Sequence, residues 1–144
     1  MRIGEGCTRL VATCSRSTSA LDIAQQMSAL HVGDVIVVDD KGGQLTPVGV
    51  VTDRDLVVKV MAAGIDAGSI QAGDLVGGMV ETACESELMH DAVWHLRRKR
   101  VRRLPVVDAH GHLIGILTSD DVARFLADEL TALNCIATDQ AARG

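Results

Sequence analysis

An internal duplication dominates this sequence. The segment GVVTDRD at residues 49–55 returns as GILTSDD at residues 115–121, 66 positions later. Upstream, the match continues at an offset of 69 positions, where VIVVD at residues 35–39 returns as LPVVD at residues 104–108. The offsets differ by three residues, and the difference falls around a Lys-Gly-Gly stretch at residues 41–43. We therefore expect two copies of one folding unit, the first with a longer hairpin loop.

Each copy is predicted to contain a strand, a helix, two strands and a second helix. The fold class is thus α/β (mixed α+β), built from tandem βαββα repeats. In the first copy the predicted elements are a strand at 11–13, a helix from Ser19 to its end at Gly33, strands at 35–39 and 48–51, and a helix at 53–63 stopped by Gly64. In the second copy they are 80–82, 86–100, 104–107, 112–117 and 119–130. The first helix begins with a capping box and should turn Ile23, Met27 and Leu30 inward.

The two repeats are predicted to share one core. The chain has 144 residues and 47% apolar content, which suffices for one compact unit. A single repeat of roughly sixty residues would be marginal alone. We expect a first repeat at 4–64, a linker at 65–73, a second repeat at 74–130 and a C-terminal tail without a clear pattern at 131–144.

The sequence carries no targeting or membrane signal that we recognise. No charged n-region is followed by an apolar h-region, and no apolar run approaches the ~20 residues that a membrane helix needs. We therefore expect a soluble, cytoplasmic protein. The four cysteines, Cys7, Cys14, Cys84 and Cys135, are then expected to be reduced thiols.

The repeated Thr-x-x-Asp lies where a strand is predicted to run directly into a helix. Unpaired backbone N–H groups at such a junction suit an anionic ligand. A threonine hydroxyl can donate to a phosphate, and an aspartate one turn later can accept from both hydroxyls of a ribose. The same pattern is also a variant capping box, which needs no ligand. Capping does not explain the glycine before each motif, where another group could approach the backbone closely.

Basic residues are concentrated in one segment, although the formal net charge is −5. Six of the seven residues from 97 to 103 are Lys or Arg. Two interpretations remain open: cations that favour a helix C-terminus, or a contact with phosphate. Nucleic acid is disfavoured, because Trp94 and Phe125 are the only aromatic residues and leave almost no stacking surface.

The two motifs, each preceded by a helix and an apolar hairpin, resemble the signature of cystathionine-β-synthase (CBS) domains. The chain resembles a tandem pair of them, a Bateman module of the stand-alone bacterial type, over about residues 4–130. The second copy, with VRRLPVVD at residues 101–108, is close to the family pattern. The first copy has Ile36 where proline is usual.

This resemblance implies a regulatory fold that binds an adenosine-containing ligand in clefts between the repeats. The ligand would be AMP, ADP, ATP, NAD or S-adenosylmethionine, bound for regulation and not for catalysis. The first cleft would be lined by Thr52, Asp55, Thr82, Val101, Arg102 and Arg103. The second would be lined by Thr118, Asp121, Thr13, Val32, Gly33 and Asp34. Because Asp34 occupies the position of Arg103, we expect the first cleft to be the better nucleotide site.

Catalysis and metal binding have weaker support. The sequence has no His-Glu-x-x-His, Cys-x-x-Cys, Walker or Gly-x-Ser-x-Gly motif, so we expect no enzyme. The alternative function is a metal- or thiol-redox-responsive CBS protein without nucleotide binding, because five His and four Cys are present. However, His110 and His112 lie in a predicted turn, and His90 and His95 are too rotated for one helix face. No metal site is therefore predicted.

The resemblance also implies self-association and signalling. We expect a homodimer in which a small-molecule adenosyl ligand favours one arrangement of the repeats. That shift would be passed to a separate effector protein, which the chain does not contain, or else the chain would serve as ligand storage. Neither nucleic acid nor a membrane is expected as a partner.

Overall fold

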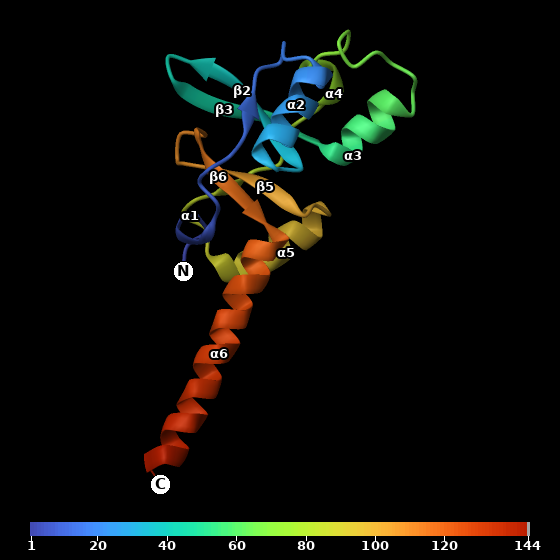
Figure 1. The fold of residues 1–144 in the computed structure, drawn as a ribbon. Coiled ribbons are helices and arrows are strands. Elements are labelled where there is room, and N and C mark those ends of the chain that lie inside the picture. The colour runs from blue at the N-terminus through green and yellow to red at the C-terminus, as the bar shows by residue number, and fades with distance from the viewer. Residues whose placement is uncertain (144) are drawn as a thin grey trace.

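A computed structural model describes residues 1–143 and contains two three-stranded sheets, one from each repeat (Figure 1). The first sheet has the order β1 (Thr13–Cys14), β2 (Asp34–Lys41), β3 (Gln44–Thr52), and the second has the order β4 (Ala83–Cys84), β5 (Arg103–Val107), β6 (Leu113–Thr118). In both sheets the short first strand is parallel to the second, and the second and third strands form an antiparallel hairpin. The mixed α+β class predicted from the repeat is confirmed.

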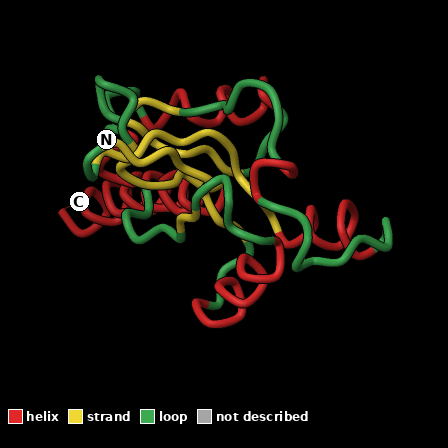
Figure 2. Tube along the Cα trace, turned by 90° about the horizontal axis from the view of Figure 1, so that it is seen from above, coloured by secondary structure: helices red, strands yellow, loops and turns green. Residues whose placement is uncertain are grey.

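The strands lie together in the middle of the body, with helices around them (Figure 2). The first repeat contributes α2 (Ala20–Leu30) and α3 (Asp53–Asp55), which continues directly as a π-helix, η1 (Leu56–Met61). The second repeat contributes α5 (Met89–Lys99) and α6 (Ser119–Arg143). Two four-residue helices, α1 (Ile3–Gly6) and α4 (Ala72–Leu75), precede the first strands of the two repeats.

The short helices α1 and α4 extend the duplication, because they too lie 69 positions apart. Each packs on the repeat that it does not directly precede. Ile3 of α1 is buried in the core of the second repeat, and Ala72 and Leu75 of α4 are buried in the core of the first. The segment predicted as a linker, residues 65–73, thus contains the start of a helix that completes a core. The repeat boundaries themselves stay a prediction.

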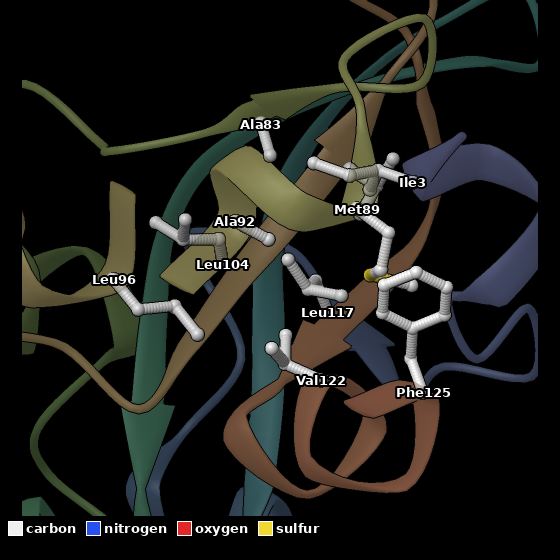
Figure 3. Close-up of a cluster of buried hydrophobic side chains, with 10 residues drawn as sticks. Ile3, Ala83, Met89, Ala92, Leu96, Leu104, Leu117, Val122 and Phe125 are labelled. Carbon is white, nitrogen blue, oxygen red and sulfur yellow. The ribbon is translucent and has the colours of Figure 1, made fainter. Parts of the chain in front are cut away.

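The prediction of a single shared core was wrong: each repeat has its own apolar core, and a third cluster joins the two sheets. Figure 3 shows the core of the second repeat, where the side chain of Met89 lies beside Ile3 and its sulfur lies next to the Phe125 ring. Between the sheets, Ile36 of β2 and Ile116 of β6 are buried in one cluster. The two repeats are therefore packed against each other across β3 and β6 as well as through the short helices.

The first helix ends earlier than the prediction at Gly33. It ends at Leu30, because His31 takes the left-handed conformation with φ of 54° and turns the chain towards β2. Leu30 therefore lies at the surface and is 54% exposed, so its predicted inward position was wrong. Ile23 and Met27 are buried as predicted.

Three other elements of the second repeat differ from prediction. The strand predicted at 80–82 is wrong, because the parallel pairing with β5 begins at Ala83, whose side chain is the one buried in the core. The helix predicted from residue 86 begins at Met89, after a turn. The last helix does not end at Leu130 but continues to Arg143 and projects from the body (Figure 1). Residues 131–143 contain alanines and neither Gly nor Pro, so nothing in them stops the helix.

Candidate ligand-binding cleft

A cleft of about 800 Å³ lies between the two repeats. One wall is the end of β3 and the start of α3, and the opposite wall is the start of β5 with the residues just before it. Of the residues predicted for the first cleft, five line it: Thr52, Asp55, Val101, Arg102 and Arg103. Thr82 does not belong to the lining, which instead includes its neighbours Val80 and Glu81. The structure thus brings most of the predicted set together.

Thr52 and Asp55 form the capping box that opens α3. The backbone N–H of Asp55 donates to Thr52 Oγ1 at 3.1 Å, and the N–H of Thr52 donates to Asp55 Oδ2 at 2.9 Å. The capping interpretation is therefore correct for both residues. Capping uses one carboxylate oxygen of Asp55, and the other, Oδ1, lies 3.4 Å from Lys59 Nζ. The side chain of Asp55 is 25% exposed and lines the cleft.

Cations outnumber carboxylates along the cleft. The cations are Arg54, Lys59, Arg100, Arg102 and Arg103, and the carboxylates are Asp53, Asp55 and Glu81. Sequence reasoning missed Lys59, although its position four residues after Asp55 places both on one helix face. Arg103 forms an ion pair with Asp34, which begins β2 of the other repeat. An anionic group would therefore find a positive environment here.

The basic residues between positions 97 and 103 line two separate parts of the surface. Its end, from Arg100 to Arg103, lines the cleft. Its start does not, because Arg97 and Arg98 border a separate hollow beside Trp94 on α5. The guanidinium carbon of Arg97 lies 5.8 Å from the centroid of the Trp94 ring, in cation–π contact.

The equivalent aspartate of the second repeat is already contacted by the chain. Asp121 and Thr118 form a second capping box, with N–H donors at 3.1 and 3.0 Å. The free oxygen of Asp121, Oδ1, lies 3.5 Å from the Thr8 hydroxyl and 3.5 Å from Arg124 Nη1. Its side chain is only 5% exposed. The acceptor that a ribose would need is therefore covered in this repeat.

The other residues predicted for the second cleft are dispersed. Thr13 lies in β1, where its carbonyl accepts from the side chain of Gln26, and Val32 packs against the first core. Gly33 and Asp34 contact residues of the first cleft instead: the carbonyl of Gly33 accepts the N–H of Asp53 at 2.9 Å, and Asp34 pairs with Arg103.

The glycine before each Thr-x-x-Asp motif allows a close backbone contact. A Cβ on Gly115 would lie 2.6 Å from the carbonyl oxygen of Thr8, and one on Gly49 would lie 2.6 Å from the Val76 side chain. Thr8 and Ile116 also exchange both backbone hydrogen bonds, at 2.9 and 2.8 Å. The segments after α1 and α4 therefore dock on equivalent strands, which explains why glycine recurs.

Gly115→Ala is expected to lower the free energy of unfolding by about 1–3 kcal/mol, because the new methyl meets backbone that two hydrogen bonds hold in position. The urea midpoint of unfolding measures the loss. Gly77→Ala is the control, since nothing lies within 4 Å of a Cβ there, and its effect should stay within about 0.5 kcal/mol. Equal effects of the two substitutions would contradict the close contact.

Residues 1–143 contain neither a disulfide nor a group of side chains that could hold a metal ion. All four cysteines are free, with Cys14 buried and Cys135 exposed. Burial raises the pKa of the Cys14 and Cys7 thiols, which favours their neutral, less reactive form. Within residues 1–143 no three His, Cys, Asp or Glu side chains are grouped as metal ligands. Over the same residues, no helix has the length and apolarity to cross a membrane.

Several known proteins are similar to this chain in sequence and in fold. An uncharacterised protein of Methanopyrus kandleri is 38% identical over 120 residues, which cover 83% of this chain and 60% of that protein. The chain thus spans less than two thirds of that relative's length. The crystal structure of CBSX2 in complex with AMP is 31% identical, with a TM-score of 0.72, covering 88% of this chain and 96% of that one.

A second solved structure carries metal. Hypoxic Response Protein I, solved with two coordinated zinc ions, is 27% identical, with a TM-score of 0.73, covering 86% of this chain and 98% of that one. The sequence profile of the CBS domain matches twice, at residues 7–62 and 72–128. The chain therefore belongs to the CBS domain family, as a pair of CBS domains.

Proposed function

We propose that this chain is a non-catalytic regulatory module whose cleft between the repeats binds an adenosine-containing ligand. The observation that carries the proposal is the convergence of Thr52, Asp55 and the Arg102–Arg103 pair on one cleft of about 800 Å³. Such a volume is of the size that small-molecule sites have in proteins. The similarity to CBSX2, which was solved in complex with AMP, supports the same ligand class.

In this proposal the five predicted residues that line the cleft bind different parts of the ligand. Asp55 Oδ1 accepts hydrogen bonds from the ribose hydroxyls, while Oδ2 keeps the capping bond. Arg102 and Arg103 bind phosphate, for which guanidinium groups are suited because they donate two parallel hydrogen bonds. Val101 packs on the ligand, and Thr52 is next to it. AMP, ADP, ATP, NAD and S-adenosylmethionine all contain the adenosine that these residues would bind.

We propose one occupied cleft per chain. Asp121 already has the Thr8 hydroxyl and Arg124 beside its free oxygen, and its side chain is far less exposed than that of Asp55. A ligand in the second repeat would have to displace the Thr8 contact first. In the first cleft the free oxygen of Asp55 has Lys59 Nζ beside it at 3.4 Å, but the side chains of Lys59 and Asp55 are 52% and 25% exposed, against 5% for Asp121.

Regulation would proceed through a dimer and a separate effector protein. Ligand binding favours one arrangement of the two repeats, because residues of both line the cleft, and the dimer transmits the difference to the effector. Exposed apolar side chains on η1, α5 and α6 support self-association: Val57, Val58, Met61, Trp94, Leu126 and Leu130. A cytoplasmic location stays a prediction.

Thermal unfolding and calorimetric titration with AMP, ADP, ATP, NAD and S-adenosylmethionine test the proposal. A ligand at a hundred times its Kd should add about 2.7 kcal/mol to the free energy of unfolding. The calorimetric stoichiometry should be one ligand per chain. The absence of binding by every adenosyl compound, with binding of zinc at defined stoichiometry, would replace this proposal with the metal-responsive alternative.

A further inference from the structure

We propose that Asp34 is an internal counter-ion for Arg103 and sets how strongly the cleft prefers ligands with a phosphate over ligands without one. This inference rests on the proposed function, in which Arg103 binds the phosphate of an adenine nucleotide. Arg103 Nη1 donates to Asp34 Oδ2, so the guanidinium already has an anionic partner supplied by the protein. A phosphate that binds Arg103 must therefore share the guanidinium with Asp34 or displace Asp34 from it.

The ion pair lies at the edge of the cleft. Arg103 begins β5 and lines the cleft, with 32% of its side chain exposed. Asp34 begins β2 and is the register partner of Thr52, which lines the opposite wall. The residue before it, Gly33, accepts the N–H of Asp53, another lining residue. The carboxylate of Asp34 is thus held beside the wall that carries Thr52, and it reaches the arginine of the facing wall.

The duplication explains how opposite charges come to face each other. Asp34 and Arg103 occupy equivalent positions, 69 residues apart, at the start of the second strand of each repeat. Two arginines here would repel each other and would leave both guanidinium groups available for phosphates. The aspartate instead neutralises the remaining arginine and places a negative charge next to any phosphate that binds it.

Asp34 should therefore act against phosphate and not against the nucleoside. Adenosine carries no charge, so its affinity depends on Asp55 and on apolar contacts that Asp34 does not touch. AMP carries a phosphate that competes with Asp34 for Arg103. The pair is partly exposed, with 32% and 23% of the two side chains accessible, so water screens the interaction and the effect is moderate.

The ratio of the AMP and adenosine affinities tests this inference. Calorimetric titration of Asp34→Asn should give an AMP affinity about two- to fivefold higher than that of the unmodified chain, with the adenosine affinity unchanged. Asp39→Asn is the matched control. Asp39 is on the same strand and also pairs with an arginine, Arg16, but neither residue lines the cleft. The ratio of the AMP and adenosine affinities should not change in Asp39→Asn.

A double variant connects the effect to the ion pair. On an Arg103→Gln background, Asp34→Asn should give a markedly smaller gain in AMP affinity, because the competition for the guanidinium is gone. Asp34→Ser removes the same charge and provides the test if the asparagine variant unfolds. An unchanged or lowered AMP-to-adenosine ratio in Asp34→Asn would overturn the inference while the proposed function stands. If the unmodified chain binds neither AMP nor adenosine, the inference fails, and the proposed function fails with it only if ADP, ATP, NAD and S-adenosylmethionine do not bind either.

Discussion

Asp55→Ala is expected to weaken AMP binding by about 1.5–3 kcal/mol, which corresponds to roughly 10- to 150-fold in Kd. The reason is that the carboxylate would accept from the ribose hydroxyls, and hydrogen bonds to a charged group are stronger than those between neutral groups. Isothermal titration calorimetry with AMP measures the loss directly. The same loss is expected for adenosine, because both compounds have the ribose.

The capping role of Asp55 must be separated from ligand binding. Asp55→Asn keeps an oxygen that can accept from the Thr52 N–H, but it removes the negative charge. This variant should retain the stability of the chain to within about 0.5 kcal/mol and still lose AMP affinity. Asp121→Ala removes the matching capping box from the other repeat and should leave AMP affinity unchanged. Equal losses in the Asp55 and Asp121 variants would show that only capping is involved.

The duplication made much of the site predictable. Two copies in register identify the strand-to-helix junctions, so Thr52 and Asp55 could be placed at the start of a helix that follows a strand. The resemblance to CBS domains supplied the cleft itself and, for its facing wall, Thr82, Val101, Arg102 and Arg103; the last three line the cleft and Thr82 does not.

Contacts between the repeats were not predictable in the same way. The pairing of Arg103 with Asp34 joins residues 69 positions apart, and no local pattern indicates it. For the same reason Asp34 was expected to act in the second cleft, whereas it contacts an arginine of the first. The contact of Thr8 with Asp121 is more remote still, at 113 positions, and it covers the oxygen that the repeat pattern made equivalent to that of Asp55.

Sequence patterns missed the shortest helices and misplaced one helix end. The helices α1 and α4 have four residues each, which is too short for a hydrophobic period, so one fell outside the predicted elements and the other fell at a predicted linker. The end of α2 was predicted at Gly33, but the helix ends at Leu30, where the next residue, His31, takes the left-handed conformation. Helix ends depend on where the next strand must start, which a single sequence does not encode locally.

Ile3→Ala is expected to lower the free energy of unfolding by about 2–5 kcal/mol, the largest effect on stability that we predict. Ile3 is fully buried among side chains of the second repeat (Figure 3), so its truncation leaves a cavity that fixed neighbours cannot fill. The backbone around Ile3 is also fixed. The N–H of Ile3 donates to the carbonyl oxygen of Glu87 at 2.8 Å, and the N–H of Gly4 donates to the carbonyl oxygen of Glu85 at 3.0 Å. Urea unfolding followed by circular dichroism measures the change.

Two further variants make this prediction specific to the docking of α1. Ile3→Val removes one methylene and should cost only about 0.5–1.5 kcal/mol. Leu10→Ala, at a side chain that is 94% exposed, should change stability by no more than about 0.5 kcal/mol. Because α1 completes the second core and α4 completes the first, the Ile3 variant should still unfold in one transition with an unchanged denaturant slope. A loss below about 1 kcal/mol in Ile3→Ala would mean that residues 1–6 do not form part of the core, and the segment after them would then have no anchor to hold Thr8 against Asp121.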